Sequence, residues 1–228
     1  MPEGQVNKVV FLDVGHGRSY GYNRDCDPGA MSNFKYPNGQ LALIYEEEVV
    51  RVIRSQMMMH LRLINAKNAC VHIESVEGDT YKTRHAGVEG RMKFLTDTCR
   101  TVSSGKEPVM EGLYIQLHLN AGNGQYSLVI HDDRSHKGEE SAKKLIEWLE
   151  VPGIKNKRTG NTIDFPRARG CIGDIWPIKN VCGVVYEPAF IDTHMTNIME
   201  LMPGMSLPTV KQSLILALTA SVQGWIDS

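Results

Sequence analysis

Short apolar runs alternate along this chain with segments in which apolar residues recur every three or four positions. Strands are expected near Lys8–Asp13, Cys70–Ser75, Leu113–Leu119, Tyr126–His131 and Val181–Tyr186, and helices near Glu46–Ile64, Gly87–Val102, Ser141–Leu149 and Pro208–Ile226. Such alternation is typical of an α/β fold with a mostly parallel, twisted sheet flanked by helices. No repeat and no long Pro/Gly-rich linker divides the sequence, so residues 1–228 are expected to form a single domain.

Composition narrows the functional classes further. The net charge is −1, with 22% charged residues, which argues against electrostatic capture of nucleic acid or membrane. None of the five cysteines forms a CxxC pair, so neither a disulfide scaffold nor a cysteine zinc site is expected. The first residues lack a signal-peptide pattern, and no stretch of about 18 apolar residues occurs. These features predict synthesis in the cytoplasm, and the chain is expected to be a monomer.

The first candidate functional residue is His16, which stands between two glycines where an apolar strand ends, in the stretch "VVFLDVGHG". A histidine needed only for packing does not require bare backbone on both sides. The segment that follows, Arg18–Leu43, is predicted to be a long ordered surface loop near His16, because it carries four tyrosine or phenylalanine residues.

Glu46 is the second candidate. On a helix with about 100° per residue, it lies on the face of the apolar residues that begin at Val49 and Val50, whereas Glu47 is rotated away from that face. A carboxylate on a buried face is costly unless it is paired or bound to a metal. Periodicity also allows a simpler interpretation, in which Glu46 stays hydrated in the first helical turn and interacts with the helix dipole.

Two further candidates come at the ends of predicted strands. His118 closes the run "GLYIQLHLNAG", where it faces the same way as Tyr114 and Gln116, and Glu187 closes "VCGVVYEP". Ligands of open α/β sheets bind at the carboxyl ends of strands. Two histidines and one carboxylate form a common catalytic zinc shell, and a separate carboxylate can then transfer protons. The residues therefore predict a single-zinc hydrolase.

Five motifs in this order, "FLDVGHG", "DPGA", "TR", "LHLNA" and "EPAFIDT", resemble the zinc-dependent N-acetylmuramoyl-L-alanine amidases of the amidase_3 type. The resemblance implies a six-stranded sheet of the zinc-exopeptidase-like, phosphorylase/hydrolase-like kind. It also implies hydrolysis of the amide between N-acetylmuramic acid and L-alanine in peptidoglycan. By motif, His16, Glu46 and His118 match the ligands of one Zn²⁺ ion, and Glu187 matches the catalytic glutamate.

Some positions depart from the family pattern. Arg18 replaces a glycine, and the long stretch between His16 and the acidic ligand leaves Glu47 as an alternative. Arg84 and Arg91 match basic positions of the family, and a substrate contact is conceivable only for Arg84. His131 and the following aspartates are more simply explained as an acidic turn than as a second metal site.

One expectation about biological use and two rival functions remain at this point. A cytoplasmic amidase with no separate wall-binding domain suggests a bacteriophage endolysin that reaches the cell wall through a holin-type pore. The rivals are a zinc carboxypeptidase or aminopeptidase of similar fold, and a non-catalytic protein that binds peptidoglycan.

Overall fold

The structure of this chain is a computed structural model. It describes residues 7–15, 29–76, 84–102, 111–175, 178 and 180–228, with the side chains of the second helix described from Met92 onward. Candidate residue His16 and its neighbour Arg18 lie outside the described residues. Arg84 and Arg91 lie on a described helix, but their side chains do not belong to the described part.

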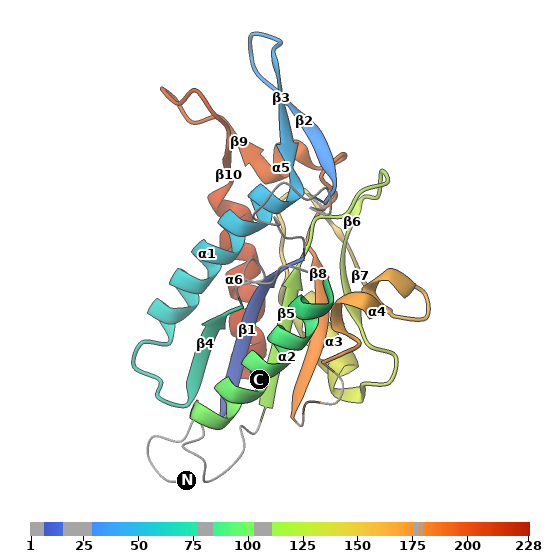
Figure 1. Cartoon of the computed structure of the whole chain (residues 1–228). Coiled ribbons are helices and arrows are strands. Elements are labelled where there is room, and N and C mark those ends of the chain that lie inside the picture. The colour runs from blue at the N-terminus through green and yellow to red at the C-terminus, as the bar shows by residue number, and fades with distance from the viewer. Residues whose placement is uncertain (1–6, 16–28, 77–83, 103–110, 176–177, 179) are drawn as a thin grey trace.

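A six-stranded sheet forms the centre of the molecule (Figure 1). Across the sheet the order is β4 (Val71–Ser75), β1 (Lys8–Val14), β5 (Glu111–Leu117), β8 (Val181–Glu187), β6 (Tyr126–His131) and β7 (Asn156–Asn161). The first four strands run parallel to one another, whereas β6 pairs antiparallel with β8 and parallel with β7. The prediction of an α/β domain with a mostly parallel sheet of about six strands is confirmed.

Helices cover both faces of this sheet, as Figure 1 shows with α2 in front of the strands and α6 behind them. The helices are α1 (Glu46–Ile64), α2 (Arg84–Val102), α3 (His136–Trp148), α4 (Pro166–Ile172), the short α5 (Met195–Ile198) and α6 (Gln212–Asp227). Residues of α1, α3 and α6 share one hydrophobic core with Val10 and Leu12, and residues of α2 and α4 share another with Val9 and Phe11. Alternation along β1 therefore supplies both cores.

Two elements, strand β7 and helix α4, are not marked by apolar runs in the sequence. Strand β7 reads NKRTGN and lies at the sheet edge, where charged residues discourage pairing with another chain. Helix α4 has only seven residues and begins at Pro166, a favourable first helical position.

The predicted loop Arg18–Leu43 is wrong over its second half. Residues Met31–Lys35 (β2) and Leu41–Tyr45 (β3) form an antiparallel hairpin that projects at the upper end of Figure 1. Its turn contains Asn38 and Gly39, and Gly39 has φ +84°, a conformation that suits glycine. A second small pair is formed by β9 (Met199–Glu200) and β10 (Thr209–Val210), and the segment between them is hydrogen-bonded to the hairpin through Tyr36 and Ser206. Among the helices of the described part, none is long and apolar enough to cross a membrane.

Candidate active site

The start of helix α1 meets the carboxyl ends of the two central strands, β5 and β8, at the upper edge of the sheet (Figure 1). Four side chains gather there, namely Glu46, His118, Asn120 and Glu187, which we call the Glu46 cluster. Parallel strands end at the same edge, so residues distant in sequence are brought together by the topology.

Glu46 is buried, with 2% of its surface exposed, and its carboxylate has several partners. One oxygen, Oε2, accepts a hydrogen bond from the backbone N–H of Ala30 at 2.7 Å. The other, Oε1, accepts from the backbone N–H of Leu119 at 2.8 Å and lies 3.1 Å from Nδ1 of His118. The alternative in which Glu46 stays hydrated is therefore wrong.

His118 follows strand β5 directly, and Gly15 provides the space for its ring. A Cβ atom on Gly15 would lie 1.9 Å from Nε2 of His118, so any side chain there would displace the imidazole. The backbone N–H of Gly15 donates to the carbonyl of Leu117 at 2.9 Å, which continues the pairing of β1 with β5. Gly15 is the first glycine of the "GHG" motif, so this glycine makes room for His118.

Glu47 is buried as well, at 2% exposure, which the predicted rotation away from the core face did not anticipate. Arg51, one helical turn later, donates from Nε to Oε1 of Glu47 at 2.7 Å. A guanidinium partner at this spacing explains how the carboxylate tolerates burial. The structure brings Glu46, rather than Glu47, into contact with His118.

Glu187, the last residue of β8, accepts a hydrogen bond at Oε2 from Nδ2 of Asn120 at 2.6 Å. The two residues come from the loops and ends of adjacent strands, since Leu117 pairs with Tyr186 in the register of β5 and β8. Glu187 therefore lies at the same edge as His118, as the sequence predicted.

The donor set at this edge fits a zinc ion. Nδ1 of His118 and Oε1 of Glu46 are 3.1 Å apart, and two ligands of one tetrahedral zinc are about 3.3 Å apart when each bond is about 2.0–2.1 Å. Nε2 of His118 lies 3.4 Å from Oε1 of Gln116, which can accept its proton. With the proton on Nε2, Nδ1 and the carboxylate are both acceptors, and a cation is then the partner that satisfies both.

A complete ligand set does not lie within the described residues. In that part of the chain, no group of three or more His, Cys, Asp or Glu side chains is placed to hold a metal ion. Glu46 and His118 contribute two donors, and the third predicted ligand, His16, falls outside it.

The loops after β5 and β8 are joined beside the Glu46 cluster. Asp192 accepts hydrogen bonds from the backbone N–H groups of Gly122 at 2.7 Å and Asn123 at 3.0 Å. Burial alone would raise the pKa of Asp192, but its hydrogen bonds, led by those from Gly122 and Asn123, hold the pKa below its ordinary value. Phe190 fills the space over Gly124, where a Cβ atom would lie 2.1 Å from its ring.

His194 belongs to the same pair of loops. It is buried, and its Nδ1 accepts from the backbone N–H of Phe190 at 3.1 Å. Burial lowers the pKa of His194, and the carboxylate of Asp192 opposes that shift in part. His194 is therefore held neutral as a structural residue of the loop.

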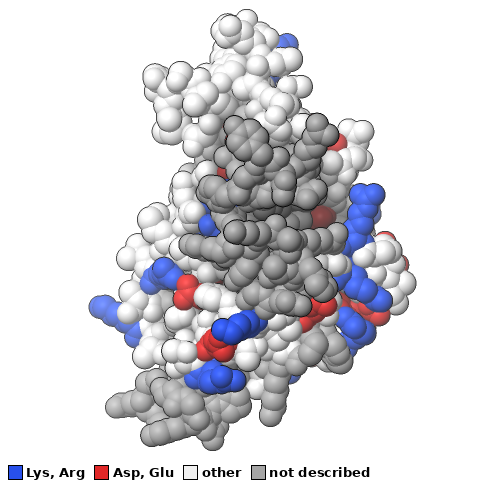
Figure 2. Space-filling view, in the orientation of Figure 1, with Lys and Arg blue, Asp and Glu red and all other residues white. Residues whose placement is uncertain are grey.

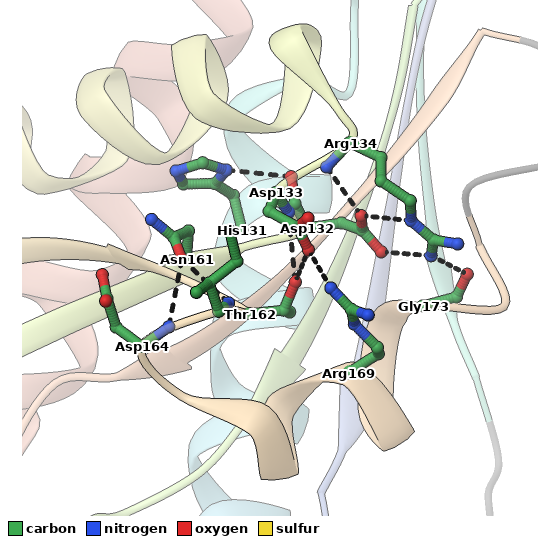
Figure 3. A network of polar contacts seen from close by, with 10 residues as sticks. His131, Asp132, Asp133, Arg134, Asn161, Thr162, Asp164, Arg169 and Gly173 are labelled. Carbon is green, nitrogen blue, oxygen red and sulfur yellow. Dashed lines mark hydrogen bonds and ion pairs between the residues drawn. The ribbon is translucent and has the colours of Figure 1, made fainter.

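A second polar cluster lies at the carboxyl ends of β6 and β7 (Figure 3). We call it the Asp132 cluster, and its members are Asp132, Asp133, Arg134, Thr162 and Arg169. Arg134 donates from Nε and Nη2 to both oxygens of Asp132, at 2.8 and 2.6 Å, while Thr162 and Arg169 donate to Asp133. His131 contacts the backbone carbonyl of Asp132 at 3.0 Å. The acidic-turn interpretation of this stretch fits these contacts.

The upper end of the molecule is nearly devoid of charge in Figure 2, where the β2–β3 hairpin and the β9–β10 connection lie. Its exposed apolar side chains are Met31, Leu41, Leu43, Met202, Met205 and Leu207. The hydroxyl of Tyr36 donates to the carbonyl of Ser206 at 3.2 Å and links the two segments. Because β3 runs directly into Glu46, this apolar end adjoins the Glu46 cluster.

Two residues near the site were not assigned a role from the sequence. Asn120 and Gln116 stand two positions on either side of His118 and share its side of the strand, and alternation alone could have identified both. Asp13 of the first motif is buried and accepts from the hydroxyl of Tyr114 at 2.5 Å. Asn120 and Gln116 are neutral amides, so a search for ionisable residues passes over them although alternation places them beside His118.

Similarity to known proteins is found in the structure of this chain and not in its sequence. No family model and no curated protein sequence matches this chain. The CwlD amidase from Clostridioides difficile, solved with the GerS lipoprotein, superposes with a TM-score of 0.56 and 16% identity, covering 97% of this chain and 99% of that one. The amidase AmiC2 of Nostoc punctiforme gives a TM-score of 0.52 with 14% identity, covering 99% and 100%.

The catalytic domain of an endolysin also superposes on this chain. The catalytic domain of the CD27L endolysin, which targets Clostridia difficile, matches with a TM-score of 0.52 and 16% identity, covering 96% of this chain and 97% of that domain. At these identities the likeness concerns the fold. The chain therefore has the fold of the N-acetylmuramoyl-L-alanine amidases over nearly its whole length.

Proposed function

We propose that this chain is an N-acetylmuramoyl-L-alanine amidase that hydrolyses the amide between N-acetylmuramic acid and L-alanine in peptidoglycan. His16, Glu46 and His118 hold one zinc ion in this proposal, and Glu187 acts as general base and then general acid. The observation that carries it is the contact between Glu46 and His118 at the edge of a sheet that is shared with such amidases. The placement of Glu187 beside them supports the catalytic assignment.

The proposed reaction divides the chemistry between the metal and the chain. A zinc ion bound at Glu46 and His118 would polarise the scissile carbonyl and make a water molecule more acidic. The Glu187 carboxylate accepts the proton of the attacking water and then delivers it to the nitrogen of L-alanine as the amide bond breaks. The backbone N–H groups of Ala30 and Leu119 keep the Glu46 carboxylate in place throughout.

Digestion of purified peptidoglycan tests this function. The wild-type chain is expected to release peptides that begin with L-alanine, as identified by mass spectrometry and amino-terminal labelling, and a chelator is expected to stop the release. Glu187→Ala is expected to bind one zinc per chain and to release peptides about 100- to 10,000-fold more slowly than the wild type. Glu150→Gln, which changes an exposed carboxylate that pairs with Lys157, serves as the matched control and keeps wild-type activity. Zinc-loaded wild-type protein that leaves the amide intact would contradict the proposal.

The same experiment separates the rival functions. A co-catalytic aminopeptidase needs two metals about 3.5–4 Å apart, so two zinc ions per chain and release of single amino acids would favour it. A carboxypeptidase would shorten the stem peptide without freeing its L-alanine amine. A wall-binding protein would sediment with peptidoglycan and release no product.

We further propose that the activity is lytic, on the basis of the likeness to an endolysin catalytic domain. Co-expression in a bacterial host with a holin-type pore protein is then expected to clear the culture, whereas expression of either protein alone is not. Clearing that persists in Glu187→Ala would show that the lysis does not come from amide hydrolysis.

A further inference from the structure

Asn120 holds the carboxylate of Glu187 through a hydrogen bond whose direction is fixed by chemistry. Its Nδ2 donates to Oε2 of Glu187 at 2.6 Å, and its Oδ1 accepts from the backbone N–H of Ala121 at 2.8 Å. A carboxylate only accepts and a backbone N–H only donates, so the side-chain amide of Asn120 has one orientation that satisfies both partners. The donor therefore faces Glu187.

The backbone of Asn120 is fixed from both sides as well. Its N–H donates to the carbonyl of Ala189 at 2.9 Å, and its carbonyl accepts from the N–H of Ile191 at 2.8 Å. These bonds form an isolated parallel bridge between Asn120 and Phe190, beyond the ends of the named strands. The hydrogen bonds from Gly122 and Asn123 to Asp192 close the same junction farther out.

We propose that Asn120 is a positioning residue for the general base Glu187, an inference that rests on the proposed amidase function. A glutamate at a strand end has three rotatable side-chain bonds, and its carboxylate must be aligned before a proton can move. The junction of the two loops places the Asn120 amide rigidly, and the amide places Oε2 of Glu187. Misplacement of a reacting group by about 1 Å can cost about 100-fold in rate, so a single anchoring bond has a measurable effect on turnover.

Steady-state kinetics on a soluble muropeptide tests this inference. Asn120→Ala is expected to lower kcat by about 10- to 100-fold, with KM within about threefold of wild type and one zinc still bound per chain. Asn120→Asp keeps the side-chain shape and the acceptor for Ala121, but it removes the donor and sets a second carboxylate against Glu187. It is therefore expected to lose at least as much kcat. Asn156→Ala removes an exposed asparagine of β7, whose amide donates to the carbonyl of Gln125, and serves as the matched control.

A coupled pair of variants separates positioning from general loop damage. If Asn120 acts through Glu187, Asn120→Ala in a Glu187→Ala background changes the residual rate by less than about twofold. An equal loss of rate in both backgrounds, a rise in KM with unchanged kcat, or full activity of Asn120→Ala would each overturn the proposal.

A structural measurement distinguishes failure of the positioning role of Asn120 from failure of the amidase function. Crystal structures are expected to show one orientation of the Glu187 carboxylate in the wild type and several in Asn120→Ala. If the wild type cleaves no peptidoglycan, the amidase function and the role of Asn120 as an aid to its base both fall. If the wild type cleaves normally and Glu187 stays in a single orientation without Asn120, only the positioning role falls.

Discussion

The Glu46 cluster and the Asp132 cluster each place a buried carboxylate, Glu46 or Asp132, beside the ends of strands, yet they use different partners. Asp132 and Asp133 are each held by the guanidinium group of an arginine, a charge that is permanent at any ordinary pH (Figure 3). Glu46 is held by two backbone N–H groups and faces an imidazole. Arginine neutralises a carboxylate and fixes it, whereas an imidazole and a carboxylate that face each other can share a cation. This difference supports our proposal of a structural role for the Asp132 cluster and of metal binding for the Glu46 cluster.

Removal of a proposed ligand gives the largest expected effect. Glu46→Gln keeps the side-chain shape and one oxygen acceptor but removes the charge, so zinc affinity is expected to fall by about 100-fold or more, since changes to residues that only support ligands already cost about 10- to 100-fold. Competition with a chromophoric chelator measures it. Glu47→Gln is the matched control, because Glu47 faces Arg51, and its zinc affinity is expected to stay within about twofold. Equal losses in both variants would contradict the assignment of Glu46.

Removal of the central carboxylate from the other cluster is expected to affect stability instead. Asp132→Ala removes a buried carboxylate and the two hydrogen bonds that it accepts from the partly exposed Arg134 side chain, and is expected to cost about 1–3 kcal/mol of unfolding free energy. Urea titration measures this loss. Zinc affinity and kcat per folded molecule are expected to remain at wild-type values, and a specific loss of either would remove the distinction between the clusters.

Gly15→Ala tests the space on which the Glu46 cluster depends. The added methyl group would lie 1.9 Å from the His118 ring, so the imidazole must leave the position in which it contacts Glu46. We expect a loss of about 1–3 kcal/mol in stability together with weakened zinc binding. Gly39→Ala in the hairpin turn is a useful contrast, because the cost there is backbone strain at φ +84° with zinc binding preserved. Wild-type zinc affinity in Gly15→Ala would show that the ring position is not required.

The sequence predicted the parts of this molecule that depend on burial. The helix Glu46–Ile64 occurs as predicted, and the alternation along β5 correctly places His118 at the strand end with Tyr114 and Gln116 on its side. The contact between Glu46 and His118 joins residues 72 positions apart. It was expected because ligand sites of open α/β sheets lie at the carboxyl ends of the strands. The ligand and base assignments of His16, Glu46, His118 and Glu187 stay predictions.

Other features could not be derived from apolar periodicity. The edge strand β7 is polar, and the β2–β3 hairpin carries its signal in the dipeptide Asn38-Gly39 rather than in a buried face. The burial of Glu47 depends on Arg51, and the role of Asn120 depends on a junction between two loops. Such pairwise polar contacts become visible only once the chain is folded.

A fall in pH is expected to destabilise the loop beside the Glu46 cluster before it destabilises the Asp132 cluster. This is the smallest effect among the predictions. The pKa of His194 is lowered by burial, so its contribution to stability is fully present above about pH 6.5 and is lost as the pH falls and the unfolded chain takes up the proton. The pKa values of Asp132 and Asp133 are lowered by their hydrogen bonds, above all from Arg134 and Thr162 respectively, so their contributions last until the pH approaches about 4. One proton limits the His194 effect to about 1.4 kcal/mol per pH unit.

Thermal unfolding between pH 7.5 and 5.5 measures this difference. The wild type is expected to lose stability over that range, and His194→Asn is expected to lose less, because the asparagine oxygen can accept from the N–H of Phe190 without titrating. The loop that carries His194 adjoins the Glu46 cluster through Asp192, so this early loss belongs to the region of the proposed site. Parallel curves for the two proteins would show that the acid sensitivity arises elsewhere, and the contrast between the regions would then rest on metal binding and stability alone.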